Sequence, residues 1–208
     1  LRVREGGSVE VTAPRRVSER EIRDFVAGKT AWLTKYMALV PEKIKFQYVT
    51  GEIHHVFGRA YPLQVCLGMR DDAVVSTDGE LQLVLRTKQR EREKVFKEGM
   101  KRILLWEIEK QLEIWTKRMA IPESRITGVT IRVMKSRWGS CRRVTGRFSF
   151  ALDLVTKPKE CIEAVVVHEL CHLFAAGHGP DFYARMETYL PDYKERDRLL
   201  ASLPRELV

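Results

Sequence analysis

Three of the chain's five histidines lie within eleven residues, and this cluster carries the clearest chemical signal in the sequence. His168 and His172 are four residues apart, and Glu169 follows the first of them, in an HExxH pattern. Residues four apart in an α-helix share one face, so both imidazoles can bind one metal ion. Glu169 is rotated by about 100° from His168. It is therefore predicted to act as a general base on a metal-activated water rather than as a ligand.

A third ligand has to come from outside this turn of helix, and His178 is the candidate. It lies six residues after His172 and directly after Gly177. If the helix ends at Gly177, the chain can turn and bring His178 back toward the other two histidines. Three protein ligands leave the fourth position of a zinc ion open for water, whose pKa then falls to about 7. We therefore predict one zinc ion, although other divalent metals also suit imidazole ligands.

The segment that carries the motif is expected to be a buried helix, opened by Pro158 and ended by Gly177. Apolar residues are expected on almost all sides of this helix, which is typical of a central helix. Burying histidines and a glutamate without partners costs roughly several kcal/mol, and a metal ion would supply the partner. The alternative is a pair of core histidines that bond to backbone groups, because HExxH alone also arises by chance.

A basic segment, residues 135–147, precedes the strand that leads into this helix. It contains five lysines and arginines and no acidic residue. One interpretation is that Arg137, or the cluster of Arg142, Arg143 and Arg147, holds a negative group or a developing oxyanion near the metal. The other is a solvated loop. The tripeptide that begins with Trp138 is predicted to form a packed turn.

Five further side chains are candidates for roles at or near the metal. Tyr183 could donate a hydrogen bond to the oxyanion, and Asp181 could orient a ligating imidazole. Cys171 lies between the two motif histidines but is turned to one side of the metal face, so we expect a small buried residue there. His54 and its neighbour His55 are adjacent in a predicted strand, so they point to opposite faces and cannot chelate one ion together.

The rest of the chain supplies the elements that position these residues. Two short strands around Gly6-Gly7 predict a hairpin, and Ser18 with Glu21 predicts the capped start of a helix that ends at Pro41. The other expected elements, in chain order, are strands over residues 44–86, a long amphipathic helix over 88–120, two strands on either side of the basic segment, a helix from Pro180 and a last helix over 192–203.

Composition narrows the class of protein. The 208 residues are 44% hydrophobic and 31% charged, as in ordinary globular domains, and no apolar run is long enough to span a bilayer. Four scattered cysteines without a CxxC pair favour reduced thiols in a cytoplasmic protein. The formal net charge of +9 is typical of a basic solvated surface and also of attraction to an anionic ligand.

Several of these stretches together resemble the YgjP-like metallopeptidase family, which is related to the SprT and WLM zincins. The resemblance implies that His168, His172 and His178 bind zinc and that Glu169 is catalytic. Two positions depart from the family pattern: Ala151 stands where an asparagine is usual, and Gly177 stands where an asparagine is frequent. The matching stretches are LRV, SVEVTAP, EIRDFVAGKTAWL, GEIHHVFGRAYPLQV, SRWGSC, VVVHELCHL, GHGPDFY and PDYKERDRLL.

These observations predict an α+β fold with two parts. Residues 1–87 are expected to form a β-rich N-terminal subdomain with one helix, packed on a zincin-like domain of residues 88–208 that carries HExxH on a buried helix. The predicted function is a zinc-dependent hydrolase, first of all a metallopeptidase acting on peptides. A metal-dependent pyrophosphatase acting on nucleoside triphosphates is an alternative, since metal-activated water serves both reactions. A third is a non-enzymatic, zinc-stabilised module that binds nucleic acid through its basic surface.

Overall fold

The computed structural model describes residues 1–3, 9–14, 16–39, 45–87 and 91–207. Contacts divide the chain into two compact units, Leu1–Lys45 and Phe46–Val208. The boundary predicted after residue 87 therefore falls inside the second unit. The physical reason is that two strands from the N-terminal side of that boundary pack against the long helix from its C-terminal side.

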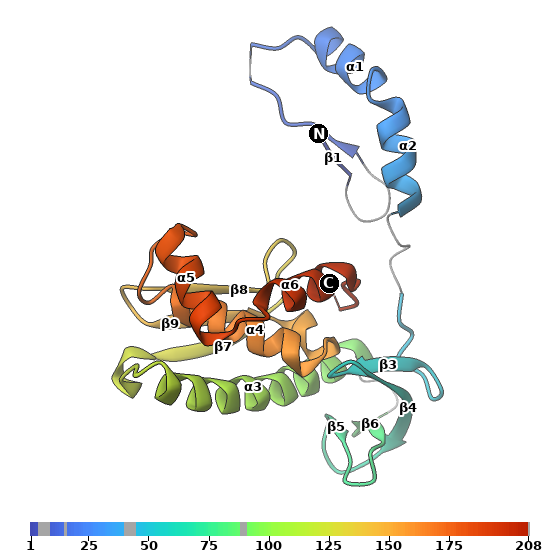
Figure 1. Ribbon diagram of the computed structural model, residues 1–208. Helices are drawn as coiled ribbons and strands as arrows, with labels where there is room; N and C mark the ends of the chain where they lie inside the picture. Colours follow the sequence, from blue (N-terminus) through green and yellow to red (C-terminus); the bar gives the residue numbers. More distant parts are fainter. Residues whose placement is uncertain (4–8, 15, 40–44, 88–90, 208) are drawn as a thin grey trace. The chain divides into compact units, whose positions relative to one another are not determined.

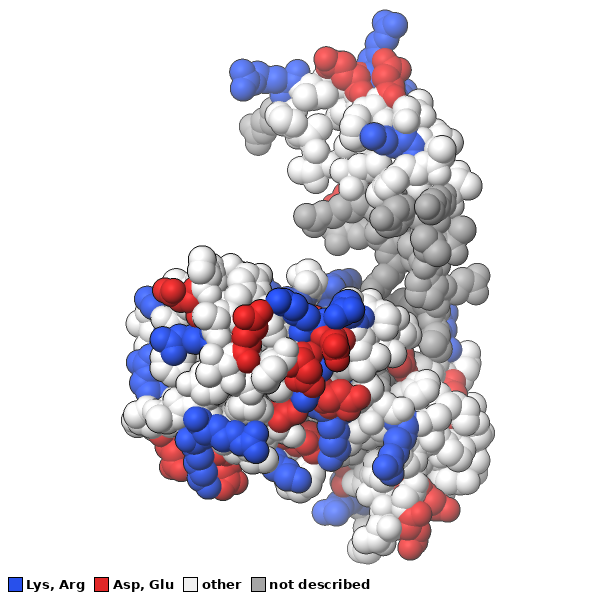
Figure 2. All heavy atoms as spheres, viewed as in Figure 1, with Lys and Arg blue, Asp and Glu red and all other residues white. Residues whose placement is uncertain are grey.

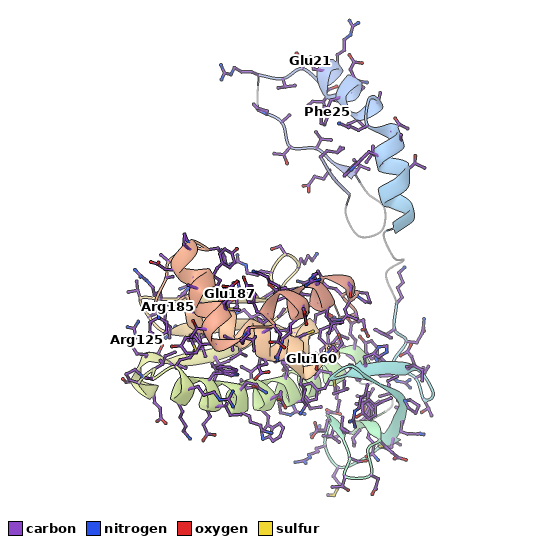
Figure 3. The ribbon with its side chains drawn as sticks, in the orientation of Figure 1. Glu21, Phe25, Arg125, Glu160, Arg185 and Glu187 are labelled. Atoms are coloured by element: carbon purple, nitrogen blue, oxygen red, sulfur yellow. The ribbon has the colours of Figure 1, made fainter. Side chains whose placement is uncertain are left out.

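The first unit contains two short strands and two helices. Strand β1 (Arg2–Val3) pairs antiparallel with β2 (Val9–Glu10), and the predicted turn at Gly6-Gly7 lies outside the described residues. Helix α1 (Glu19–Ala27) begins with the predicted capping box, in which the Ser18 hydroxyl accepts from the Glu21 amide and the Glu21 carboxylate accepts from the Ser18 amide. Figure 3 labels Glu21 on this helix. The single predicted helix is wrong, because a turn at Gly28 separates α1 from α2 (Thr30–Leu39). Glycine is a poor helix former, which favours the break there.

The second unit begins with a four-stranded sheet over the region predicted to be β. Its strands are β3 (Ile53–Val56), β4 (Arg59–Leu67), β5 (Asp72–Val75) and β6 (Leu81–Leu85), in the order β3-β4-β6-β5. Strand β4 runs parallel to β6, and the other two pairs are antiparallel. Alternate residues of β6 are fully buried, as expected for a sheet with one face on the core.

Helix α3 (Arg92–Arg118) confirms the long helix that the sequence predicts and forms the base of the core. Its residues Phe96, Met100, Leu104 and Ile108 recur every four positions and are completely or almost completely buried. Gly99 allows β5 to approach closely, because a Cβ there would overlap the backbone of Ala73. The helix therefore joins the four-stranded sheet to the part of the unit that contains α4 (Figure 1).

A second, three-stranded sheet comes after α3 and the 3₁₀ turn η2 (Glu123–Arg125). Its strands are β7 (Gly128–Arg132), β8 (Gly139–Arg142) and β9 (Arg147–Ala151), in the order β7-β9-β8. Strand β9 is parallel to β7 and antiparallel to β8. The predicted packed turn that begins at Trp138 is wrong from Gly139 onward, since those residues pair with β9 as the edge strand β8.

Three helices complete the second unit after the 3₁₀ turn η3 (Leu152–Thr156): α4 (Lys159–Cys171), α5 (Pro180–Tyr189) and α6 (Tyr193–Ser202). Helix α4 contacts α3, α5, α6 and β8, so it is the buried central helix (Figure 1). It ends at His172 rather than at Gly177. The amides of Leu173 and Phe174 bond to carbonyls three residues back, which tightens the last turn and stops the helix.

The three sheets and six α-helices of the described residues confirm the α+β class. The HExxH residues lie on α4 and at its C-cap, His172. Over the described ranges of the chain, no helix is both long and apolar enough to cross a membrane.

Candidate active site

The three histidines of the predicted metal site converge. His168 lies in the last turn of α4, His172 is its C-cap, and His178 comes from the loop before α5. The Nε2 atoms of His168 and His178 are 3.0 Å apart, and one ring nitrogen from each of the three residues lies within 4.8 Å of the others. The early end of α4 at His172 gives the chain room to return within six residues.

This donor set fits a zinc ion. Two ligands of a tetrahedral zinc with bonds of 2.0–2.1 Å are separated by about 3.3 Å, close to the spacing of His168 and His178. The Nδ1 atom of His172 lies 3.2 Å from the carbonyl oxygen of Ala175 and can donate a hydrogen bond to it. The lone pair on Nε2 is then available to bind the ion. Burial, with the two neighbouring imidazoles, lowers the pKa of His168 to about 4, so this ring is neutral and able to ligate at physiological pH.

The aromatic ring of Phe182 supports all three imidazoles. Its centroid lies 4.8 Å from that of His168 and 4.7 Å from those of His172 and His178. The side chain is 1% exposed, so its ring is held by the core of the unit. Phe182 was not identified from the sequence; the available signal was an apolar residue in the first turn of the helix that follows the third histidine.

Glu169 is buried beside the histidines, with 5% of its surface exposed. Burial raises the pKa of its carboxyl group to about 7, and the positive charge of Arg137 opposes this shift. Strand β8 lies directly against the carboxyl group, because a Cβ added to Gly139 would be 2.5 Å from Oε1 of Glu169. Only glycine lets the strand come so close. The sequence contained this signal in the tripeptide Trp-Gly-Ser but gave no reason to connect it with Glu169.

A cavity of about 710 Å³ opens onto these four residues. Arg137 and Arg143 line it, together with Asp197 and Leu200 of α6. Arg142 does not line this cavity but a neighbouring groove. Of the four arginines predicted to hold a negative group, Arg137 and Arg143 therefore line the cavity with the histidines, and Arg142 and Arg147 line the neighbouring groove.

The remaining candidate residues are placed as follows. Tyr183 lies outside the cavity lining, with its ring centroid 6.4 Å from that of His178. Among the described residues, no hydrogen bond joins Asp181 to a histidine. Cys171 is fully buried, and burial raises the pKa of its thiol to about 11. His54 and His55 lie in β3 and pair with the carboxylates of Glu52, at 2.9 Å, and Glu206, at 3.0 Å.

A sequence comparison decides the family. The model of the family described as "YgjP-like, metallopeptidase domain" matches residues 1–203. The chain belongs to the YgjP-like metallopeptidase family. No curated protein matches this YgjP-like chain. A similar solved structure is the metallopeptidase zymogen of Pyrococcus abyssi abylysin, with 24% sequence identity, a TM-score of 0.41, and coverage of 49% of this chain and 99% of that chain.

Family membership confirms the predicted resemblance and supports a metal-dependent hydrolase. A metallopeptidase family implies a metal ion and a peptide substrate, and the three-histidine group is a site able to hold such an ion.

The C-terminal segment of this YgjP-like protein holds the loop on one wall of the cavity. The guanidinium carbon of Arg205 lies 3.7 Å from the ring centroid of Trp138. The same side chain donates to the carbonyl oxygens of Met134, at 2.6 Å, and Arg137, at 3.2 Å. The segment is anchored in turn by the buried carboxylate of Asp153, which accepts from two backbone amides at 2.8 Å each. No short-range sequence pattern predicts the contact of Arg205 with this loop, because the partners are about seventy residues apart.

Proposed function

We propose that this protein is a zinc-dependent metallopeptidase in which His168, His172 and His178 hold the ion and Glu169 is the general base. The observation that carries the proposal is the convergence of three imidazoles and one buried carboxyl group on a single cavity. Family membership supports the same class of reaction. It also favours a hydrolase over a non-enzymatic binding module.

The chain's own residues can bind the ion, move protons and stabilise charge. Bound there, zinc would polarise the scissile carbonyl and lower the pKa of water from about 15.7 to about 7. Glu169 accepts a proton from the attacking water and gives it to the leaving amine. Burial raises the pKa of this carboxyl group, which makes the carboxylate a stronger base toward the water.

Arg137 is the proposed donor to the oxyanion. It lines the cavity, and its positive charge acts on Glu169, so it stands near the reacting groups. Arg143 lines the same cavity and is a second cation available to the substrate. Tyr183 remains a candidate donor beside His178, with its side chain about half exposed.

The deciding experiment is a substrate panel run with the zinc-loaded protein, with and without a chelator. We expect cleavage of a denatured protein that the chelator abolishes and that added zinc restores. Glu169→Gln should keep one zinc ion per chain and lose turnover, because the amide cannot accept the proton. Unchanged turnover in this variant would remove Glu169 from the mechanism.

The same panel tests the two alternatives. Chelator-sensitive release of pyrophosphate from nucleoside triphosphates, with no cleavage of protein, would favour the pyrophosphatase. A non-enzymatic module should show no turnover of either substrate, and should bind nucleic acid equally well after Glu169→Gln, with a steep dependence on salt.

We also propose a cytoplasmic location. All four cysteines are free, and two of them, Cys161 and Cys171, are completely buried. Free thiols persist where the compartment is reducing.

A further inference from the structure

A second groove lies beside the active-site cavity, on the outer face of the sheet β7-β9-β8. Its volume is about 760 Å³. Phe148 and Phe150 of β9 point into the core, so the alternate residues Arg147 and Ser149 point outward. The strand register places Arg142 opposite Arg147, and Ser140 opposite Ser149. The groove is thus built on regular strands rather than on a loop.

The groove is strongly positive. It is lined by five cationic side chains and no acidic one: Arg132, Lys135, Arg137, Arg142 and Arg147. None of the five forms an ion pair with any residue in the described parts of the chain. By contrast, lysine and arginine alternate with aspartate and glutamate on the face of this unit shown in Figure 2. Like charges gathered in a lining that contains no acidic residue attract an anionic ligand.

The groove is continuous with the active site. It shares four lining residues with the cavity that holds the histidines: Ser136, Arg137, Ser140 and Cys141. A chain bound in the groove therefore passes directly into the cavity that contains Glu169. Any ligand of the groove that is longer than a few residues reaches the reacting groups as well.

The lining favours an acidic peptide over a nucleic acid. Single-stranded nucleic acids are held by aromatic rings on which the bases stack. The aromatic side chain that lines this groove, Phe148, is 1% exposed and offers no stacking surface. Instead the floor carries hydroxyl groups, with Thr130 and Ser149 hydrogen-bonded at 2.9 Å. Arginine forks beside hydroxyl groups suit the carboxylates of aspartate and glutamate.

We propose that this groove binds an acidic segment of the peptide substrate, adjacent to the bond that is cut. The inference rests on the proposed metallopeptidase function, and it makes the enzyme selective for peptides with aspartate or glutamate on one side of the scissile bond. The outward-facing Arg132 and Arg147 are the residues whose loss should affect this selectivity without touching the histidines.

The test measures binding in the zinc-loaded Glu169→Gln protein, so that turnover plays no part. The probes are two fluorescein-labelled peptides that differ only by replacement of four glutamates with glutamines. We expect the glutamate peptide to bind more tightly, and increasing salt to remove the difference. In Arg132→Gln/Arg147→Gln, the ratio of the two affinities should fall about tenfold, as expected for the loss of two exposed charge pairs.

The matched control is Arg59→Gln/Arg70→Gln, which removes the same charge from exposed positions in β4 and in the loop between β4 and β5. It should leave the affinity ratio unchanged. Equal affinities for the two peptides, or equal effects of the two double variants, would overturn the proposal. So would a single-stranded oligonucleotide that displaces the glutamate peptide at a concentration lower than that of the unlabelled peptide itself.

A parallel cleavage assay with the wild-type protein separates this proposal from the proposed function. Cleavage of both peptides at equal rates would refute the proposed preference for acidic peptides and would leave the proposed peptidase function standing. If no peptide or protein is cleaved with metal present, the peptidase function fails, and with it the role of the groove in substrate selection.

Discussion

Replacing Gly139 by alanine should disable Glu169 without disturbing the metal ligands. The new Cβ would lie 2.5 Å from Oε1, 2.7 Å from Cγ and 2.9 Å from Cδ of Glu169. An ordinary contact is 3.4 Å or more, so the carboxyl group or the strand has to move by roughly 0.9 Å, the difference between 3.4 Å and 2.5 Å. The atoms in conflict belong to the end of a side chain, so the carboxyl group is expected to move first.

The Gly139→Ala substitution should lower the activity strongly and the stability modestly. A misplacement of about 1 Å at a reacting group can cost about 10²-fold in rate. Overpacking a buried site costs about 1–3 kcal/mol, and each kcal/mol lowers the Tm of a protein of this size by about 2–4 °C. We therefore expect kcat/KM to fall about 100-fold and the Tm to fall by a few degrees, with one zinc ion per chain retained.

The assay is chelator-sensitive cleavage of a denatured protein, with metal content and thermal unfolding measured on the same samples. Gly28→Ala is a suitable control, because a Cβ there meets its nearest neighbour at an ordinary 3.5 Å and the residue belongs to the other unit. Wild-type activity in a folded, zinc-loaded Gly139→Ala protein would show that the close approach of β8 does not position Glu169, and the reasoning would be refuted.

Three further predictions follow from the site and the core. His178→Ala should weaken zinc binding by more than about 100-fold, which is the largest loss usual for a residue that only supports a ligand. Metal titration with a competing chelator checks this, and an unchanged zinc affinity would exclude His178 as a ligand. Arg205→Ala should lower the free energy of unfolding by about 2 kcal/mol, from the lost contact with Trp138 and lost hydrogen bonds; urea unfolding measures it, and Arg205→Lys should restore only part, since lysine lacks the planar fork. Burial lowers the pKa of His54, against the opposing effect of Glu52, so the folded state binds its proton less readily than the unfolded state. The contribution of neutral His54 to the free energy of unfolding is therefore complete above pH about 6.5 and is lost as the pH falls below that value toward the lower folded pKa. Urea unfolding at pH 7.5 and pH 5 should show that His54→Gln loses less stability on acidification than the wild-type protein does. An equal loss in the two proteins would contradict the assignment.

Local spacing alone was enough to predict the central part of the site. The interval of four residues between His168 and His172 places them on one face of any helix, whatever surrounds it. The apolar pattern of the same segment predicted that this helix would be buried, and a third histidine soon after it predicted the convergence. The capping box at Ser18 and the long helix α3 were predictable for the same reason, since each depends on residues within a few turns of one another.

Other features depended on contacts between residues far apart in the chain. Helix α4 packs against β8 and α5, and Gly139–Arg142 pair with β9 as strand β8, so the sequence signals for a turn at Trp138 and for a helix that runs to Gly177 were misleading. Strands β5 and β6 likewise pack on α3 across the boundary predicted after residue 87, and no local pattern predicts that contact.

The sequence by itself therefore determined which residues can hold a metal ion and which carboxylate stands next to them, because a helix converts fixed intervals into fixed directions. Only the tertiary structure decided what surrounds them: Gly139 thirty residues from Glu169, Phe182 under the three imidazoles, and Arg205 on the ring of Trp138. No periodicity relates such distant residues. Their approach is set by the burial of apolar surface over the whole unit, which is a property of the packed chain and not of any one segment.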